Sequence, residues 1–266
     1  MPAGDAEIAA DRLRIAGAWA IEERGDDPVE LRTVISSDDD EVVRRLGDLP
    51  GTWQLEFHDA IEVDSSAWRE HARPVVVSPR LTLRPAWLPV PRTGGGPGRG
   101  LDIAIEPGAA FGLGDHPTTR LCAAAVDRLV RPGDRVLDVG CGTGVLSIVA
   151  ACLGAGAVEA IDISPAAVEQ TVDNAVRNGV TATVSASTTP LHDVAGRYDL
   201  VVANVPAPEL VAMAVDLRGT VAPHGRLIVS GVLAAHHAHV LVALRPMTVV
   251  ATSTSGEWAA VELRHP

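Results

Sequence analysis

Lysine is absent and aromatic residues are scarce in this sequence of 266 residues. Because all 22 Lys+Arg side chains are arginine, the Gly-Lys-Ser/Thr step that a P-loop requires is missing. Phe, Trp and Tyr together make up 3% of the chain, so Val, Leu, Ile and Ala have to fill any core. Hydrophobic residues reach 47%, which is enough for a sizeable core in one large domain or two smaller ones.

Cysteine pairs and long apolar runs are also missing. Cys122, Cys141 and Cys152 lie in apolar or glycine-rich segments, and none belongs to a C-x-x-C pair, so we expect free thiols in a reducing compartment. The N-terminal Met-Pro-Ala-Gly-Asp lacks the basic start and apolar run of a secretory signal. No stretch of about 18 apolar residues occurs that could span a membrane. These features predict a cytoplasmic protein without a membrane partner.

Positive charge is in deficit, because the formal net charge is −12 at pH 7. A generic nucleic-acid binder shows a basic face, and phosphate groups would be repelled by this chain. Opposite charge speeds the encounter of two molecules. We therefore expect a basic protein or a small amine as the partner, and no direct contact with nucleic acid.

Glycine and proline are concentrated in the segment 91–100, which can hold neither a helix nor a central strand. We interpret 64–100 as a linker between a small α+β domain at 1–63 and a larger domain at 101–266. Before residue 91 the sequence predicts helices at 5–19, 38–46 and 68–72 and strands at 22–24, 29–35 and 52–63. Ser37 is expected to cap the second of these helices.

After the linker, apolar strands alternate with amphipathic helices. The predicted strands are 135–139, 158–161, 181–185, 200–203, 227–230, 247–253 and 258–264. The predicted helices are 121–130, 145–153, 165–178, 209–217 and 234–244. Such alternation predicts an α/β fold with a seven-stranded, mostly parallel, doubly wound sheet.

The segment Asp138-Val-Gly140-Cys-Gly142-Thr-Gly144 follows a predicted strand directly and opens a predicted helix. Glycines in such a turn let the backbone approach a ligand closely, at the strand ends where open α/β sheets bind ligands. Asp162 ends the next strand, where a carboxylate can accept hydrogen bonds from both ribose hydroxyls of a nucleoside. The alternative to a ligand-binding turn is a glycine-rich turn that only joins a strand to a helix.

The spacing of these glycines separates two classes of nucleotide cofactor. Dinucleotide enzymes use G-x-G-x-x-G, whereas this chain has G-x-G-x-G with Asp138 two positions earlier. A pyrophosphate beside that carboxylate would be repelled. A cofactor with a cationic amino acid end and no phosphate fits the pattern better.

These residues resemble motif I of the class I S-adenosylmethionine methyltransferases, and the wider chain resembles the ribosomal protein L11 methyltransferase family. The resemblance is carried by Trp68-Arg69, Arg84–Trp87, Ala110-Phe-Gly-Leu-Gly-Asp-His-Pro-Thr-Thr119, Asp162-Ile-Ser-Pro165, Asp173-Asn-Ala175, Asn178-Gly179, Val201-Val-Ala-Asn204, Ser230-Gly-Val-Leu233 and Gly256-Glu-Trp258. It covers about residues 65–266, while the N-terminal 60 residues match only in outline.

The resemblance implies a Rossmann-like fold, S-adenosyl-L-methionine as cofactor, no metal, and N-methylation of amines on a protein substrate that the small N-terminal domain recognises. It assigns Asn204 to the reaction itself, beside the sulfonium, where its side-chain carbonyl would help to position the target amine. It assigns a further set of residues, with Asn204, to the cofactor: Phe111, Gly112, Thr119, Asp138, Gly140, Gly142, Gly144, Asp162 and Ile163. The alternative for Asn204 is a purely structural role as a turn residue at the end of a strand.

The sequence departs from the family pattern at Leu113, at Asp115 and after Asn204, where it reads Val-Pro206-Ala-Pro208. Two prolines stiffen the loop expected to touch the substrate. They motivate a second hypothesis, a methyltransferase for a small molecule or a peptide natural product. A third, less favoured hypothesis is a non-catalytic cofactor-binding module.

Histidines supply the remaining candidates for chemistry. His116 is either a base or, as we favour, an anchor for its own loop. His236 and His237 diverge by about 100° on a helix, so these residues and His239 predict a solvent-facing helix more than a metal site.

Overall fold

The computed structural model describes residues 72–89, 100–107 and 114–266 without interruption. In the N-terminal part it describes 1–2, 5, 9–10, 13, 21–25, 27–33, 35, 39–47 and 49–57. The chain divides into two compact units, Met1–His71 and Ala72–Pro266.

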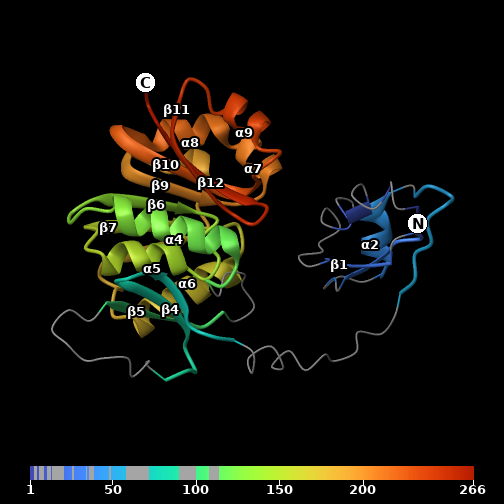
Figure 1. The fold of residues 1–266 in the computed structure, drawn as a ribbon, viewed down its shortest axis with the longest axis horizontal. Coiled ribbons are helices and arrows are strands. Elements are labelled where there is room, and N and C mark those ends of the chain that lie inside the picture. Colours follow the sequence, from blue (N-terminus) through green and yellow to red (C-terminus); the bar gives the residue numbers. More distant parts are fainter. Residues whose placement is uncertain are drawn as a thin grey trace. The chain divides into compact units, whose positions relative to one another are not determined.

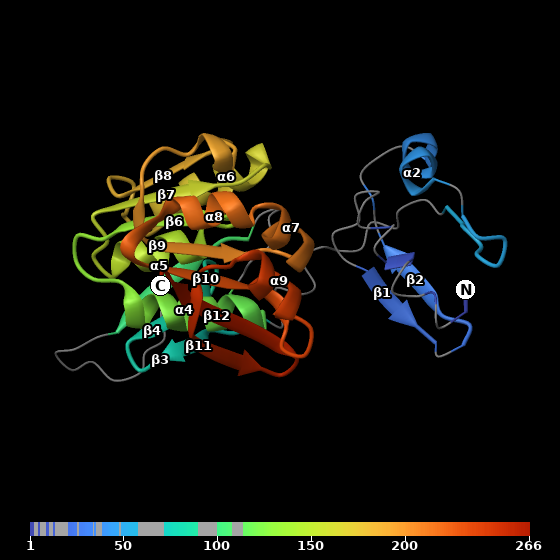
Figure 2. The same cartoon turned by 90° about the horizontal axis from the view of Figure 1, so that it is seen from above.

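The N-terminal unit contains a short antiparallel hairpin and a helix. Strand β1 (Ile21–Arg24) pairs with β2 (Glu30–Thr33), and α2 (Asp39–Leu46) buries Val42 and Leu46 against apolar neighbours. Both strands and this helix confirm the prediction, with boundaries shifted by a few residues (Figure 2).

One prediction for this unit is wrong. Residues 52–57 form no strand, and Trp53 closes a turn at the start of this segment by donating its N–H to the Pro50 carbonyl. The rest of that predicted strand, the helix near Trp68 and the Ser37 cap lie outside the described residues. Most of the predicted helix at 5–19 does so too.

The larger unit is built on a seven-stranded sheet with the order β11-β12-β10-β9-β6-β7-β8 (Figure 1). The strands are β6 (Arg135–Val139), β7 (Ala157–Ile161), β8 (Val184–Ser187), β9 (Tyr198–Asn204), β10 (Val221–Leu233), β11 (Thr248–Ser255) and β12 (Trp258–Arg264). The pairs on both sides of β6, and the pairs β7–β8 and β9–β10, are parallel, whereas β12 runs antiparallel to both of its neighbours. This confirms the predicted α/β fold with a mostly parallel, doubly wound sheet.

Helices cover both faces of this sheet, because consecutive strand residues point to opposite sides. Figure 1 shows α4 (Pro117–Leu129), α5 (Val145–Cys152) and α6 (Pro165–Arg177) on one side and α7 (Ala207–Ala212), α8 (Ala214–Thr220) and α9 (Ala238–Ala243) on the other. One core gathers Leu137, Val139, Val201 and Ala203 with Leu210, Leu217 and Val240. The other gathers Val136, Leu200 and Val202 with Val126, Ile148 and Val149.

A second, three-stranded sheet belongs to the same unit. It consists of β3 (Val75–Ser78), β4 (Leu81–Pro85) and β5 (Leu101–Ile105). Its buried side chains Leu83 and Ile105 join the core under α4 and α5. The segment interpreted as a linker at 64–100 therefore contributes two strands to the larger unit, because alternate residues of β4 are apolar and bury against that core.

Several element boundaries differ from the prediction: α4 begins at Pro117 and not at 121, and β10 spans Val221–Leu233 and not 227–230. The helix expected at 209–217 is two helices that meet at Met213. The strand expected at 181–185 begins only at Val184, because Thr183 and Val184 both donate to the Val180 carbonyl in a turn. The helix expected at 234–244 begins only at Ala238.

Candidate active site

The candidate site lies where the strand order reverses. From β6 the chain adds β7 and β8 on one side of the sheet and then crosses to place β9 and β10 on the other. The carboxyl ends of β6 and β9 diverge at such a switch point, and open α/β sheets bind ligands there. The glycine turn follows the end of β6, and Asn204 is the last residue of β9.

Asp138, at the end of β6, is buried and fastens the following helix. Its Oδ2 accepts hydrogen bonds from the backbone N–H of Ser147 at 3.1 Å and from the Ser147 hydroxyl at 2.6 Å. Burial raises the pKa of this carboxyl from 3.8 to about 6, and the two bonds from Ser147 oppose that shift. The carboxylate thus holds the first turn of α5 against the end of β6. The sequence did not reveal Ser147 as its partner.

The glycine turn needs its glycines because Gly140, Gly142 and Gly144 have φ values of 72°, 54° and 76°. The N–H groups of Gly140 and Cys141 donate to the Ile161 carbonyl at 2.8 and 3.1 Å, which ties the turn to the end of β7. A Cβ at Gly140 would lie 2.4 Å from Val205 Cγ1. The turn is therefore packed directly against the chain that leaves β9.

Asp162 follows β7 and presents an oriented carboxylate. Its Oδ2 accepts from the Gly142 N–H at 3.0 Å, and its Oδ1 accepts from the Ser164 N–H at 2.9 Å. Each oxygen keeps further lone-pair capacity for a ribose hydroxyl. Next to it, Ile163 is 96% exposed, an apolar surface suited to the flat face of an adenine.

Asn204 ends β9 at the same edge. Its Oδ1 is buried without a hydrogen-bond partner. An unpartnered buried amide oxygen costs about 1–3 kcal/mol, so native structures keep few of them. A donor group of a ligand at this position would recover that free energy.

The loop before α4 and the first turn of that helix contain the remaining candidate residues. Thr118 and Thr119, in the first turn of α4, are each 2% exposed, whereas Phe111 and Gly112 lie outside the described residues. His116 is the N-cap, with its Nδ1 2.8 Å from Thr118 Oγ1 and its ring edge-on to the Trp258 ring at 5.0 Å. Burial lowers the pKa of His116, and Asp115 opposes that shift. These contacts are those of a loop anchor.

Asn174 of α6 and Asn178, the C-cap of that helix, bind the backbone of neighbouring segments, and Asn174 supports the glycine turn. The Asn174 amide donates to the Thr143 carbonyl at 3.0 Å and to the Glu106 carbonyl at 2.8 Å. Asn178 both donates to and accepts from the backbone of Ala104 on β5, at 2.8 and 3.0 Å. The sequence pointed to Asn174 and Asn178 only through the family resemblance of Asp173-Asn-Ala175 and Asn178-Gly179. It did not reveal their hydrogen-bond partners.

The remaining histidine candidates lie at the start of α9. In the described ranges, no group of three or more His, Cys, Asp or Glu side chains is arranged to hold a metal ion. His237 instead has its Nδ1 3.1 Å from the Leu233 carbonyl.

Fold and site together define a class of protein. A sheet of this order with one reversed strand, a glycine turn after β6 and an oriented carboxylate after β7 is the arrangement of the class I methyltransferases.

Comparison with known proteins identifies the family. The family model for ribosomal protein L11 methyltransferase (PrmA) matches residues 22–266, and the chain belongs to that family. The L11 methyltransferase of Citrifermentans bemidjiense is 42% identical over 205 residues, which cover 75% of this chain and 66% of that protein. The enzyme of Geobacter sulfurreducens is 43% identical over 203 residues, with coverage of 76% and 66%.

A crystal structure of ribosomal protein L11 methylase from Lactobacillus delbrueckii subsp. bulgaricus superposes with a TM-score of 0.66 at 30% sequence identity. The match covers 72% of this chain and 99% of that one. By contrast, the matched part of the chain spans slightly less than two thirds of the length of the first curated relatives, 66% and 64%.

Proposed function

We propose that the chain is an S-adenosyl-L-methionine-dependent N-methyltransferase that acts on amines of a protein substrate, with ribosomal protein L11 as the first candidate. The observation that carries the proposal is the buried, unpartnered Oδ1 of Asn204 at the switch point, beside the glycine turn and Asp162. Family membership supports the same reaction.

The residues at the strand ends fit this cofactor. Asp162 would accept hydrogen bonds from the ribose hydroxyls, because both of its oxygens are already aimed by backbone N–H donors. Ile163 would cover the adenine, and the left-handed turn at Gly140–Gly144 would receive the methionine portion. Asp138 contributes negative charge below the turn, and Thr119, Phe111 and Gly112 are assigned to the same site through the family resemblance.

The protein's contribution to the reaction is positioning. When bound, the sulfonium supplies an already activated methyl group. Asn204 Oδ1 would accept a hydrogen bond from the target amine and so direct the nitrogen lone pair toward that methyl group. Orientation of this kind supplies about 7–11 kcal/mol of the barrier in well-aligned intramolecular reactions. The amine has to arrive unprotonated; its nitrogen forms the new N–CH3 bond as the S–CH3 bond breaks, and the proton of the resulting methylammonium group passes to solvent.

The charge of the chain favours a basic polypeptide as acceptor. A net charge of −12 attracts cationic protein segments and repels phosphate. Among the described residues, no helix is long and apolar enough to cross a membrane. A cytoplasmic protein substrate, without a membrane or nucleic-acid partner, is therefore part of the proposal.

The prolines after Asn204 have a structural explanation. Pro206 is the N-cap of α7, and Pro208 lies in its first turn, where a missing N–H costs nothing. They start a helix, so the substrate loop gives no specific support to the hypothesis of a small-molecule acceptor.

An Asn204→Ala variant tests the proposal and separates an enzyme from a binding module. Labelled S-adenosylmethionine and recombinant L11 are incubated with the parent and with the variant, and cofactor affinity is measured in parallel. We expect the variant to retain the parent Kd for S-adenosylhomocysteine within about threefold. Its kcat should fall by about 100-fold, the cost expected when a group that positions a reactant is lost.

Asp162→Asn serves as the matched control for the same experiment. It keeps the side-chain volume but replaces one hydrogen-bond acceptor by a donor, so we expect it to weaken cofactor binding and not only turnover. A folded parent that methylates neither L11 nor any protein of a cell extract would contradict the proposed function.

A further inference from the structure

The end of β10, beside the candidate site, contains a shift in the register of its pairing with β12, to which the proposed reaction assigns no role. Val229 pairs with Val261 of β12 and Val232 pairs with Ala259, so Ser230 and Gly231 together face a single residue of β12. This is a β-bulge, and Gly231 adopts a φ of 84° in it. Bulges are common next to active sites, where they redirect the chain.

The bulge is firmly held and lies next to Asn204. Ser230 is fully buried, and its hydroxyl donates to the Ala259 carbonyl at 2.8 Å. On its other side, Ser230 pairs with Asn204 in the parallel ladder between β10 and β9. Gly231 is therefore the first residue of β10 beyond the paired end of β9.

At this point the backbone of Val205 lies directly against Gly231. A Cβ at Gly231 would lie 2.4 Å from the Val205 carbonyl oxygen, 2.7 Å from its carbonyl carbon and 3.2 Å from its nitrogen. The atoms in the way are backbone atoms, which cannot rotate aside as the end of a side chain can. Any side chain at 231 must displace the peptide that follows Asn204.

The opposite side of Val205 is held by the glycine turn. A Cβ at Gly140 would lie 2.4 Å from Val205 Cγ1. Because β9 lies between β6 and β10 in the sheet, Val205 is clamped between the two segments that leave its neighbouring strands. The Asn204 amide oxygen has no hydrogen-bond partner of its own, and the residue that follows it is held by these two contacts.

We propose that Gly231 and Val205 are positioning residues for methyl transfer, which fix the Asn204 amide relative to the cofactor without touching either reactant. The inference rests on the proposed function. It assigns the glycine of the Ser230-Gly-Val-Leu233 block to catalysis by positioning and not to cofactor binding.

The test compares two ligands of the full chain by calorimetric titration. S-adenosylhomocysteine lacks the transferable group, whereas the analogue sinefungin carries an ammonium group in its place. A correctly aimed amide oxygen accepts a hydrogen bond from that ammonium group, so the parent should bind sinefungin about 10- to 100-fold more tightly than S-adenosylhomocysteine. Asn204→Ala should lose this preference.

Gly231→Ala should lose most of the sinefungin preference while binding S-adenosylhomocysteine within about threefold of the parent. Its kcat for methyl transfer should fall by about 10- to 100-fold, as expected for a displacement of about 1 Å at a reacting group. Gly179→Ala is the matched control, because Gly179 also has a positive φ, of 70°, but a Cβ there would meet nothing within 4 Å. This control should keep both the preference and kcat.

Val205→Ala covers the case in which Gly231→Ala does not fold, since it removes Cγ1 from the clamp without creating a clash. It should reduce the ligand preference in the same direction by a smaller factor. A parent-like preference in folded Gly231→Ala, or in Val205→Ala where that glycine variant does not fold, would overturn the inference. So would loss of S-adenosylhomocysteine binding by Gly231→Ala, or an unchanged preference in Asn204→Ala.

Failure of the inference and failure of the proposed function give different results. A parent that shows the ligand preference but transfers no methyl group contradicts the proposed function alone. A parent that methylates L11, with Gly231→Ala equal to it in kcat and ligand preference, contradicts the inference alone.

Discussion

At the scale of single residues, the buried carboxyl of Asp138 links the glycine turn to helix α5. Its pKa is raised from 3.8 to about 6 because burial disfavours the charged form. Above pH 6 the folded protein therefore contains an ionised carboxylate that is held chiefly by Ser147. Such a group makes the stability of the fold depend on pH.

The direction of this pH dependence follows from the two pKa values. Between pH 3.8 and about pH 6 the folded state binds the proton and the unfolded state does not, so stability from this group falls as pH rises through that window. The loss amounts to about 3 kcal/mol, because each pKa unit corresponds to about 1.4 kcal/mol.

The amide of an Asp138→Asn variant stays neutral at every pH. We therefore expect the difference in unfolding free energy between variant and parent to change by about 3 kcal/mol in favour of the variant as pH rises from about 4 to about 7. Denaturant unfolding of both proteins across that range measures the difference, and other titrating groups cancel in the comparison. A difference that stays constant with pH would show that Asp138 does not titrate in this window.

Several site residues were predictable from the sequence because their signals are local. The positive φ values at Gly140, Gly142 and Gly144 follow from a glycine pattern between a strand and a helix. Ser147 and Val205 were not predictable, because their roles come from contacts between segments that are distant in the chain. The unpartnered Oδ1 of Asn204 likewise became visible only once the neighbours of that atom were known.

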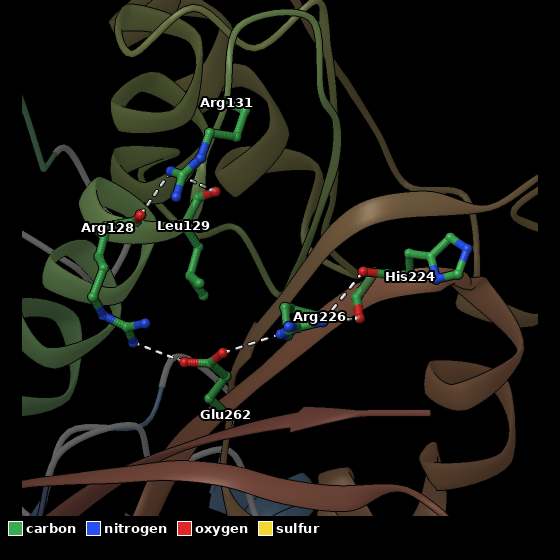
Figure 3. A network of polar contacts seen from close by, with 7 residues as sticks. Arg128, Leu129, Arg131, His224, Arg226 and Glu262 are labelled. Atoms are coloured by element: carbon green, nitrogen blue, oxygen red, sulfur yellow. Dashed lines mark hydrogen bonds and ion pairs between the residues drawn. The ribbon is translucent and has the colours of Figure 1, made fainter. Parts of the chain in front are cut away.

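At the scale of elements, α4 is tied to the strands at the end opposite its capped first turn. Figure 3 shows the Glu262 carboxylate of β12 between Arg128 of α4 and Arg226 of β10, at 2.8 and 3.2 Å. The Glu262 side chain is 5% exposed, whereas the two arginines are 55% and 31% exposed. One buried carboxylate thus joins a helix and two strands.

Removal of this carboxylate should destabilise the larger unit. Breaking a buried ion pair costs about 3–5 kcal/mol when the remaining charge has no access to water. Because both arginines are partly exposed and can be hydrated, we expect Glu262→Gln to cost less, about 1–3 kcal/mol.

Denaturant unfolding monitored at the larger unit measures this cost. Asp193→Asn is the control, because the pair of Asp193 with His192 is exposed at 63% and 67% and its loss should change stability by less than about 0.5 kcal/mol. Equal effects of the two substitutions would mean that Glu262 contributes no more than a surface charge.

Element boundaries were predictable where capping residues mark them. Ser164 caps α6, Pro165 is its first residue, and Gly179 follows its end with a φ of 70°, all as the sequence indicates. The break between α7 and α8 at Met213 was missed, because neither glycine nor proline stands there. The strands β3 and β4 were assigned to a linker, because the glycine-rich segment after them dominated the interpretation.

At the scale of the whole molecule, alternation of strands and helices was sufficient to predict a mostly parallel, doubly wound sheet. The position of β12 between β10 and β11 was not predictable from periodicity, since a strand pattern carries no information about its neighbours. In the N-terminal unit, the described part confirms two predicted strands and one helix but not the strand expected from Thr52, where the structure has a turn. Its role in substrate recognition stays a prediction, and the residues proposed for the cofactor site all belong to the range Ala72–Pro266.

The most direct test of the central claim is a calorimetric titration of the purified chain with S-adenosylmethionine, beside an Asp162→Ala variant. The account predicts micromolar binding by the parent. It also predicts a loss of at least about 1.5–3 kcal/mol in the variant, in which the hydrogen bonds to a charged carboxylate are gone. No binding by a folded parent, or equal binding by the variant, would contradict the assignment of this strand edge as a cofactor site.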